Sequence, residues 1–382
     1  MNTEEELIIS LLRSIIPGKP RFSCPPVIKK SINWTRFKEL VSYHEVYSFL
    51  YHLVKDPVGL FPADIAIFLK NNFFYHLLHC QRLLHEFFCV SAAFDQAKIR
   101  VVPLKGIAFL QDIYVHIPAR PTTDIDLLVE KINFPRAKEI LLDFGFSERL
   151  DGLTSNYWLE KQCHIEFTKR KSDKDIIFLD LHFSLDFKRK GLEILPQLWT
   201  RERDGILSPE DALFSLALHQ RRFGKALCLK NIVDAGLILK KYQNTFDWDY
   251  IIRQAELGRM RSTMFFLLTQ VKILFDSEIH LPQLKILCPN YFKRMAIQFF
   301  IKNNMFSDSL DRRTKELYFK SHLLLYDGFL EPVMYIINIP LEQFAKFYGL
   351  EPYSKKTKTF YNNRIAYIFY RAALNFISHK RD

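Results

Sequence analysis

In the stretch Thr122-Thr123-Asp124-Ile125-Asp126-Leu127-Leu128-Val129, polar and apolar residues alternate from Asp124 to Leu127, and the stretch ends in Leu128 and Val129. Successive side chains of a β-strand point to opposite faces, so Asp124 and Asp126 are expected to share one face while Ile125, Leu127 and Val129 enter a core. Two carboxylates at this spacing repel each other unless a cation lies between them, and their hard oxygens suit Mg²⁺ or Mn²⁺ better than zinc. A solvated acidic face on an edge strand is the alternative that this stretch alone leaves open.

A second apolar strand carries another acid. In Leu179-Asp180-Leu181-His182 the period of two places Asp180 and His182 on one face. A third carboxylate can complete a phosphoryl-transfer site that uses two metal ions. His182 could orient Asp180 or accept a proton, and a purely structural hydrogen bond to a neighbouring carboxylate fits the sequence equally well.

Upstream of these acids, Pro103-Leu104-Lys105-Gly106 places a glycine between a predicted strand and a predicted helix. Backbone amides at such a turn can approach phosphate groups, and the N-terminus of the helix favours their negative charge.

The periodicity of the chain divides it into three predicted regions. Residues 1–97 recur at helical spacing, 98–205 hold the strand patterns, and 206–382 return to helical spacing. The sequence thus predicts an α+β protein in which a small mixed sheet domain is flanked by N-terminal and C-terminal helical regions.

Three motifs together resemble a bacterial family of uncharacterised nucleotidyltransferases within the polymerase-beta-like superfamily. The resemblance rests on the Leu104-Lys105-Gly106 turn, on Arg120 four residues before the Asp124-Ile125-Asp126-Leu127-Leu128-Val129 strand, and on Asp180-Leu181-His182. The superfamily's wider pattern has Gly-Gly or Gly-Ser in the turn, whereas here Gly106 stands alone. The resemblance implies the polymerase-beta-like fold and a metal-dependent attack on the α-phosphate of a nucleoside triphosphate such as ATP, with pyrophosphate leaving.

The resemblance also implies roles for particular residues. Asp124 and Asp126 would hold Mg²⁺ or Mn²⁺, and Asp180 would hold a second metal ion or act as a base toward the acceptor. The residues expected to bind the nucleotide are Lys105, Gly106, Arg120 and His182. The acceptor would be a hydroxyl or phosphate of a small molecule, peptide or protein rather than nucleic acid.

Two rival functions remain open at this stage. The net charge of +12 would also suit a nucleic-acid-directed nucleotidyltransferase, and the basic, aromatic stretch 355–381 could either grip nucleic acid or form an amphipathic helix. A catalytically inactive scaffold is the second rival. Of the remaining polar pairs, His164 and Glu166 could line the cleft, and His219 and Asp234 are expected to hydrogen-bond between helices.

Cysteine usage and the apolar segments favour a cytoplasmic protein. The six cysteines show no CxxC pair and no histidine spacing typical of a zinc site, so we expect free, buried thiols in a reducing compartment. The acidic segment Met1–Leu7 does not resemble a secretory signal. The apolar stretch Met264–Phe275 is too short and too polar to cross a bilayer.

Overall fold

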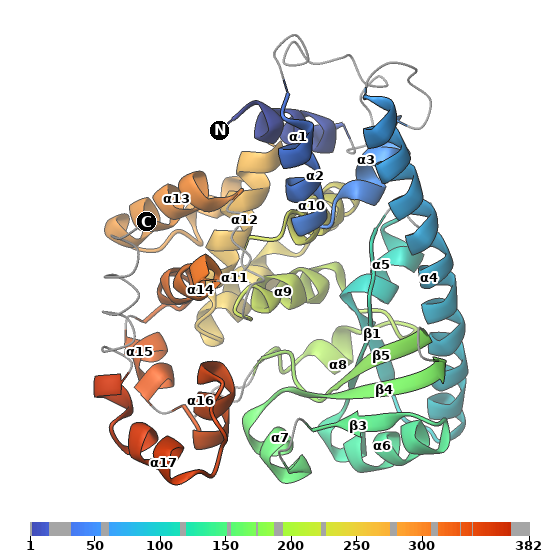
Figure 1. Cartoon of the computed structure of the whole chain (residues 1–382), viewed down its shortest axis with the longest axis vertical. Helices are drawn as coiled ribbons and strands as arrows, with labels where there is room; N and C mark the ends of the chain where they lie inside the picture. The colour runs from blue at the N-terminus through green and yellow to red at the C-terminus, as the bar shows by residue number, and fades with distance from the viewer. Residues whose placement is uncertain are drawn as a thin grey trace. The chain divides into compact units, whose positions relative to one another are not determined.

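The computed structural model describes most of the chain. The described residues are 2–14, 32–54, 61–114, 120–150, 154–172, 175–186, 194–222, 227–275, 281–306, 312–328, 330–337 and 339–367. They form a mixed β-sheet with many flanking helices, which confirms the predicted α+β class (Figure 1).

The described sheet has the spatial strand order β1-β2-β5-β4-β3. The strands are β1 Val101–Leu104, β2 Ile125–Val129, β3 Ser147–Arg149, β4 His164–Ser172 and β5 Asp175–His182. β2 and β5 run parallel, and the other neighbouring pairs are antiparallel. β4 and β5 pair as a hairpin, in which β4 extends to Ser172 and β5 begins at Asp175.

Helices precede, interrupt and follow the sheet. Those up to the hairpin are α1 Thr3–Arg13, α2 Trp34–Tyr43, α3 Tyr47–Val54, α4 Ala63–Gln96, α5 Lys105–Asp112, α6 Phe134–Asp143 and α7 Ser155–Lys161. Those after it are α8 Leu198–Arg201, α9 Pro209–His219, α10 Leu229–Lys241, α11 Trp248–Leu257, α12 Arg261–Phe275, α13 Tyr291–Asn304, α14 Arg312–Leu325, α15 Leu330–Ile337, α16 Leu341–Tyr348 and α17 Lys355–Asn362. Short 3-10 helices lie at Lys131–Asn133 and Pro282–Lys285.

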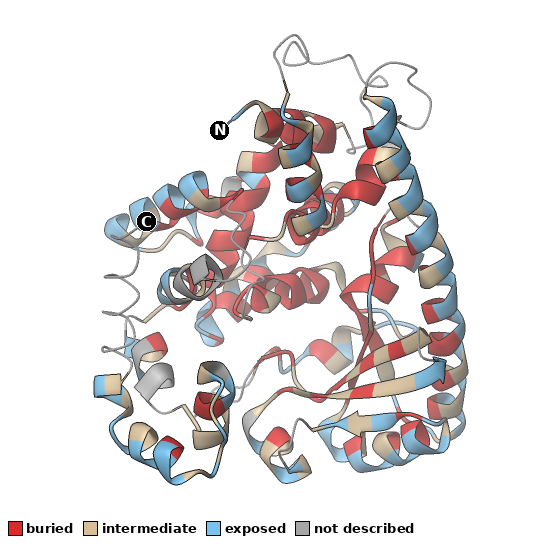
Figure 2. Cartoon of the chain, in the orientation of Figure 1, coloured by how far each residue is buried: buried red, intermediate tan, exposed pale blue. Residues whose placement is uncertain are grey.

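The hydrophobic core lies on one face of the sheet, against α4 and α6 (Figure 1). Ile125, Leu127 and Val129 of β2 are buried in this core, as the alternation predicts. Leu179 and Leu181 of β5 lie there too. Figure 2 shows α9 and α10 buried along most of their length, while the outer side of α4 is exposed. Because these residues of β2 and β5 face the core, the residues between them face the opposite side of the sheet.

The described chain separates into two compact units, Met1–Leu325 and Tyr326–Asp382. In the second unit, Phe344 contacts the rings of Tyr361 and Tyr367, and Phe360 stacks on Tyr367 with ring centroids 4.5 Å apart. These aromatic residues pack inside their own unit, in keeping with the amphipathic interpretation of this stretch. Residues 368–382, which include the rest of the basic stretch, lie outside the described residues.

The described helices include none that is both long and apolar enough to span a membrane.

Candidate active site

Two acidic residues meet because β2 and β5 are parallel neighbours. Asp126 lies directly opposite Asp180 in the register, and both point away from the core because their neighbours Leu127 and Leu179 point into it. Oxygen atoms of Asp126 and Asp180 and a ring nitrogen of His182 lie within 4.8 Å of one another. Asp124 directly precedes β2 and is partly exposed. The structure thus brings two of the three predicted metal ligands into one cluster, with the third two residues away.

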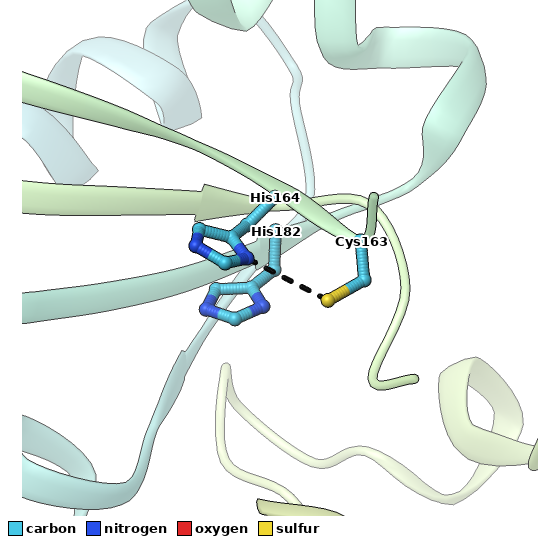
Figure 3. A group of neighbouring side chains, drawn as sticks. All are labelled: Cys163, His164 and His182. Atoms are coloured by element: carbon cyan, nitrogen blue, oxygen red, sulfur yellow. Dashed lines mark hydrogen bonds between the residues drawn. The ribbon is translucent and has the colours of Figure 1, made fainter. Parts of the chain in front are cut away.

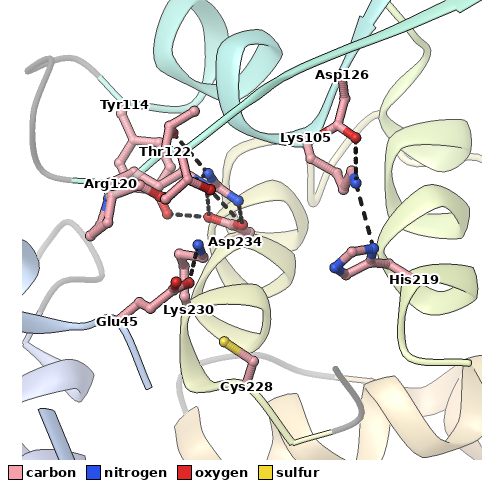
Figure 4. Close-up of polar contacts among 12 residues, drawn as sticks. Glu45, Lys105, Tyr114, Arg120, Thr122, Asp126, His219, Cys228, Lys230 and Asp234 are labelled. Atoms are coloured by element: carbon pink, nitrogen blue, oxygen red, sulfur yellow. Dashed lines mark hydrogen bonds and ion pairs between the residues drawn. The ribbon is translucent and has the colours of Figure 1, made fainter. Parts of the chain in front are cut away.

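Asp126 is buried, and its carboxylate contacts two polar side chains. Lys105 Nζ lies 2.8 Å from its Oδ1, and His182 Nε2 lies 3.0 Å from the same oxygen (Figure 4 shows the lysine pair). Burial alone would raise the pKa of Asp126, but the charge of Lys105 and the hydrogen bond from His182 hold it well below its ordinary value. Asp126 therefore stays a carboxylate.

Asp180 behaves in the opposite way. Its burial, together with the negative charges of Asp126 and Asp124, raises the pKa of Asp180 to about 8. A divalent ion held between Asp126 and Asp180 would compensate both negative charges. Hard oxygen ligands fit Mg²⁺ or Mn²⁺. The residues present therefore suit the metal ion that the sequence implied.

This cluster gives metal binding a defined pH dependence. Because a divalent ion must displace the proton from Asp180, the affinity for Mn²⁺ should rise roughly tenfold per pH unit up to about pH 8 and level off above it. Titration of the metal-free protein with Mn²⁺ at pH 6, 7, 8 and 9, followed by electron paramagnetic resonance, measures this. A flat profile from pH 6 to 8 would show that Asp180 is already ionised or is not a ligand.

Lys105 enters the site from an unusual turn. β1 ends at Leu104, and Lys105 has a φ of +45°, in the left-handed region that a lysine seldom adopts. This turn directs the buried side chain toward Asp126, and it also brings Nζ to 3.5 Å from Nδ1 of His219 on α9. Strained backbone of this kind is typical of functional sites. The turn sets the distance between the positive charge and the acids.

Gly106 is required by packing. A Cβ atom at this position would lie 2.6 Å from Cγ2 of Thr122 and 3.3 Å from Nη1 of Arg120. The sequence alone predicts only a role in phosphate approach for this glycine. The close contact with Thr122 gives a second reason for its presence, which only the three-dimensional structure reveals.

Replacing Gly106 by alanine should therefore destabilise the protein by about 1–3 kcal/mol, the usual cost of overpacking. The double variant Gly106→Ala/Thr122→Ser should recover much of this, because serine lacks the obstructing methyl group but keeps the hydroxyl that accepts from Arg120 at 3.0 Å. Urea denaturation of both variants measures the difference. Equal instability of the single and double variants would contradict the contact as its cause.

Arg120 lies in a separate buried network (Figure 4). Its Nε and Nη2 donate to both carboxylate oxygens of Asp234 on α10, at 2.8–2.9 Å. Tyr114 Oη donates to the same carboxylate at 2.6 Å, and Arg120 Nη1 donates to Thr122 Oγ1. These bonds join the segment before β2 to the helical region. Nucleotide binding by Arg120 stays a prediction, beside this structural role.

Of the other two polar pairs, His219 with Asp234 and His164 with Glu166, most members contact residues that the sequence pattern did not indicate. Asp234 pairs with Arg120, and His219 lies against Lys105, where a hydrogen bond between the two helices was expected. Glu166 forms an ion pair with the exposed Arg149 at 2.6 Å. His164, by contrast, does join the cluster, with Nε2 3.5 Å from Asp180 Oδ2.

A small, partly open pocket lies beside the acids, between the sheet and α9. Its lining residues are Leu104, Lys105, His182, Leu185, Ser215, His219 and Arg222. Arg222 was not identified from the sequence. Burial opposes its charge, but Cys163, Asp126 and Asp180 raise its pKa, so it remains a cation next to the acids. Arg222 lies just beyond the end of α9, three residues after His219, and this short separation is the signal that could have revealed it.

The fold and this cluster define an α+β protein whose acidic strands face a small, positively lined cavity, an arrangement suited to binding a divalent ion and an anionic substrate. Residues 30–276 match a protein family described as uncharacterised nucleotidyltransferase, and the chain belongs to that family. It is thus a transferase of phosphorus-containing groups. No curated protein and no solved structure matches the chain.

Proposed function

We propose that this enzyme transfers a nucleoside monophosphate from a nucleoside triphosphate to a hydroxyl or phosphate of a small molecule, peptide or protein, using Mg²⁺ or Mn²⁺. The observation that carries the proposal is the register of β2 and β5, which sets Asp126 against Asp180 beside the cationic cavity. The bound ion would neutralise the triphosphate and make its α-phosphorus more electrophilic. Asp124, Asp126 and Asp180 are the residues that would hold it.

The remaining groups suit the two substrates. Lys105 and Arg222 supply positive charge for the phosphates, and the Gly106 turn lies at the N-terminus of α5. The acceptor oxygen would form a bond to the α-phosphorus while the bond to the bridging oxygen breaks, and pyrophosphate leaves. Asp180 would either complete the metal site or accept the proton of an acceptor hydroxyl.

Of the two rivals, the inactive scaffold is disfavoured because the three acids are intact and the family is one of nucleotidyltransferases. The nucleic-acid-directed alternative would need a surface that stacks bases. The described C-terminal aromatic residues of its candidate surface pack against one another instead. We therefore keep a small molecule, peptide or protein as the acceptor, in a cytoplasmic setting.

The test is a panel of the four labelled ribonucleoside triphosphates, each with Mg²⁺ and with Mn²⁺, scored for metal-dependent binding and for pyrophosphate release. We expect one or more nucleotides to bind only with metal present. Asp180→Asn should lose most turnover, since it removes a metal ligand or the proton acceptor. An Asp180→Asn variant with full turnover would exclude that residue, and no metal-dependent binding of any nucleotide would overturn the proposal.

A further inference from the structure

Three potential ligands of a softer metal ion converge next to the acidic cluster. Cys163 directly precedes β4, and its buried Sγ lies 3.5 Å from Nδ1 of His164. His182 of β5 completes the group, with its ligand atom within 4.8 Å of the other two (Figure 3). Sequence spacing does not reveal this group, because Cys163 and His164 are adjacent and His182 is brought to them only by strand pairing.

The two histidines are oriented alike. His164 and His182 are opposite each other in the β4–β5 register, and their rings stack with centroids 4.8 Å apart at an angle of 25°. Each turns its Nε2 toward a carboxylate, His164 toward Asp180 and His182 toward Asp126. Their Nδ1 atoms therefore point toward the side on which Cys163 lies, as Figure 3 shows. Nδ1 of His182 is buried and has no hydrogen-bond partner among the described residues.

We infer that Cys163, His164 and His182 form a second metal site, selective for zinc or a similarly soft divalent ion. Thiolate and imidazole are the ligands that zinc prefers, whereas the carboxylates of the first site suit Mg²⁺ or Mn²⁺. Two ligands of one tetrahedral zinc ion lie about 3.5 Å apart for a sulfur and a nitrogen, which is the separation found for Cys163 and His164. Three protein ligands leave the fourth position open.

The surroundings of this site match those of histidine-rich metal sites. A metal-bound histidine usually donates a hydrogen bond from its other ring N–H to a carboxylate, which fixes the tautomer and makes the ligating nitrogen more basic. Asp180 and Asp126 supply such carboxylates to His164 and His182. Arg222 opposes binding, because its Nη2 donates to Cys163 Sγ at 3.3 Å and its charge repels a cation. An incoming ion must displace Arg222 from the sulfur.

The two metal sites are coupled through His182. An ion on its Nδ1 keeps the proton on Nε2, which donates to Asp126 Oδ1, the oxygen that the first site would use. The two positive ions would also repel each other. Zinc should therefore weaken Mn²⁺ binding by about tenfold, and Mn²⁺ should weaken zinc binding by the same factor. The second site itself does not depend on the proposed function, whereas its coupling to the first metal site rests on it.

Calorimetric titration of the full-length, metal-free protein with zinc tests the site directly. We expect one zinc ion per chain in the wild type and in Cys89→Ser, a matched control in which a half-exposed cysteine beside His85 is removed. Cys163→Ser and His164→Gln should each lose at least about tenfold in affinity. Cobalt should show a thiolate charge-transfer band in the wild type and in Cys89→Ser only. Unchanged zinc affinity in Cys163→Ser, or no thiolate band in the wild type, would overturn the site.

A second titration tests the coupling and separates the two proposals. Mn²⁺ affinity is measured by electron paramagnetic resonance with and without one equivalent of zinc. We expect zinc to weaken Mn²⁺ binding in the wild type and to leave it unchanged in Cys163→Ser. Zinc binding with unaltered Mn²⁺ affinity would overturn the coupling. Zinc binding in a protein that binds no Mn²⁺ at all would overturn the first metal site and, with it, the coupling and the proposed chemistry, but not the second site.

Discussion

The double variant Asp124→Asn/Asp126→Asn should lose pyrophosphate release by at least about 10³-fold relative to the wild type. A metal ion stabilises the transition state of phosphoryl transfer by several kcal/mol. Each 1.36 kcal/mol corresponds to a factor of about ten in rate. Asparagine keeps the size of the side chain and its hydrogen bond to His182, but removes the charge that holds the ion. Turnover is measured with the nucleotide that the panel identifies, at saturating Mg²⁺.

The control for this variant is Asp143→Asn, which removes an exposed carboxylate at the end of α6 in the same sheet domain. Its turnover should equal that of the wild type. Thermal denaturation of all three proteins checks that they are folded at the assay temperature. If the folded double variant turned over like the wild type, Asp124 and Asp126 would not hold a catalytic metal ion.

Removing Asp234 should cost about 3–5 kcal/mol of unfolding free energy, because it leaves a buried arginine without its partner. Arg120 is 4% exposed and Asp234 is 0% exposed, so water cannot replace the lost carboxylate. Tyr114 loses its acceptor in the same step. Urea denaturation of Asp234→Ala, with the denaturation midpoint and slope compared with those of the wild type, measures the loss.

Two further variants show whether the buried charge is the cause. Arg120→Met/Asp234→Leu removes both charges and should recover a large part of the lost stability. Glu139→Ala breaks an exposed ion pair with Arg136 and should leave the midpoint unchanged. A double variant no more stable than Asp234→Ala would contradict the explanation. If Arg120 also binds phosphate, nucleotide affinity will fall in the double variant even where stability returns.

Much of the sheet could be predicted because its central strands place acids between apolar residues at a period of two. Ile125, Leu127 and Val129 had to face a core, and Asp124 and Asp126 had to face away from it. β3 was not predicted because Ser147-Glu148-Arg149 is short and polar and has a single described neighbouring strand. An edge strand of this kind carries almost no periodic signal.

The parts of the site that escaped prediction depend on contacts between distant segments. The pairing of Arg120 with Asp234, and of Lys105 with His219, joins the sheet domain to helices more than a hundred positions later. No local spacing encodes such a contact. The Cys163 cluster was hidden for a related reason, since the strand register supplies one of its three ligands.

The parallel register of β2 and β5 links correct folding of the core to correct placement of the acids. A slip of one residue would turn Asp180 into the hydrophobic core and bring Leu179 and Leu181 out to the polar face. Burial of a lone carboxylate among leucine and phenylalanine side chains costs several kcal/mol. A chain that has packed its core has consequently also aligned its acids. Molecules with the wrong register would be too unstable to stay folded. Few folded molecules of this enzyme should therefore have misplaced acids.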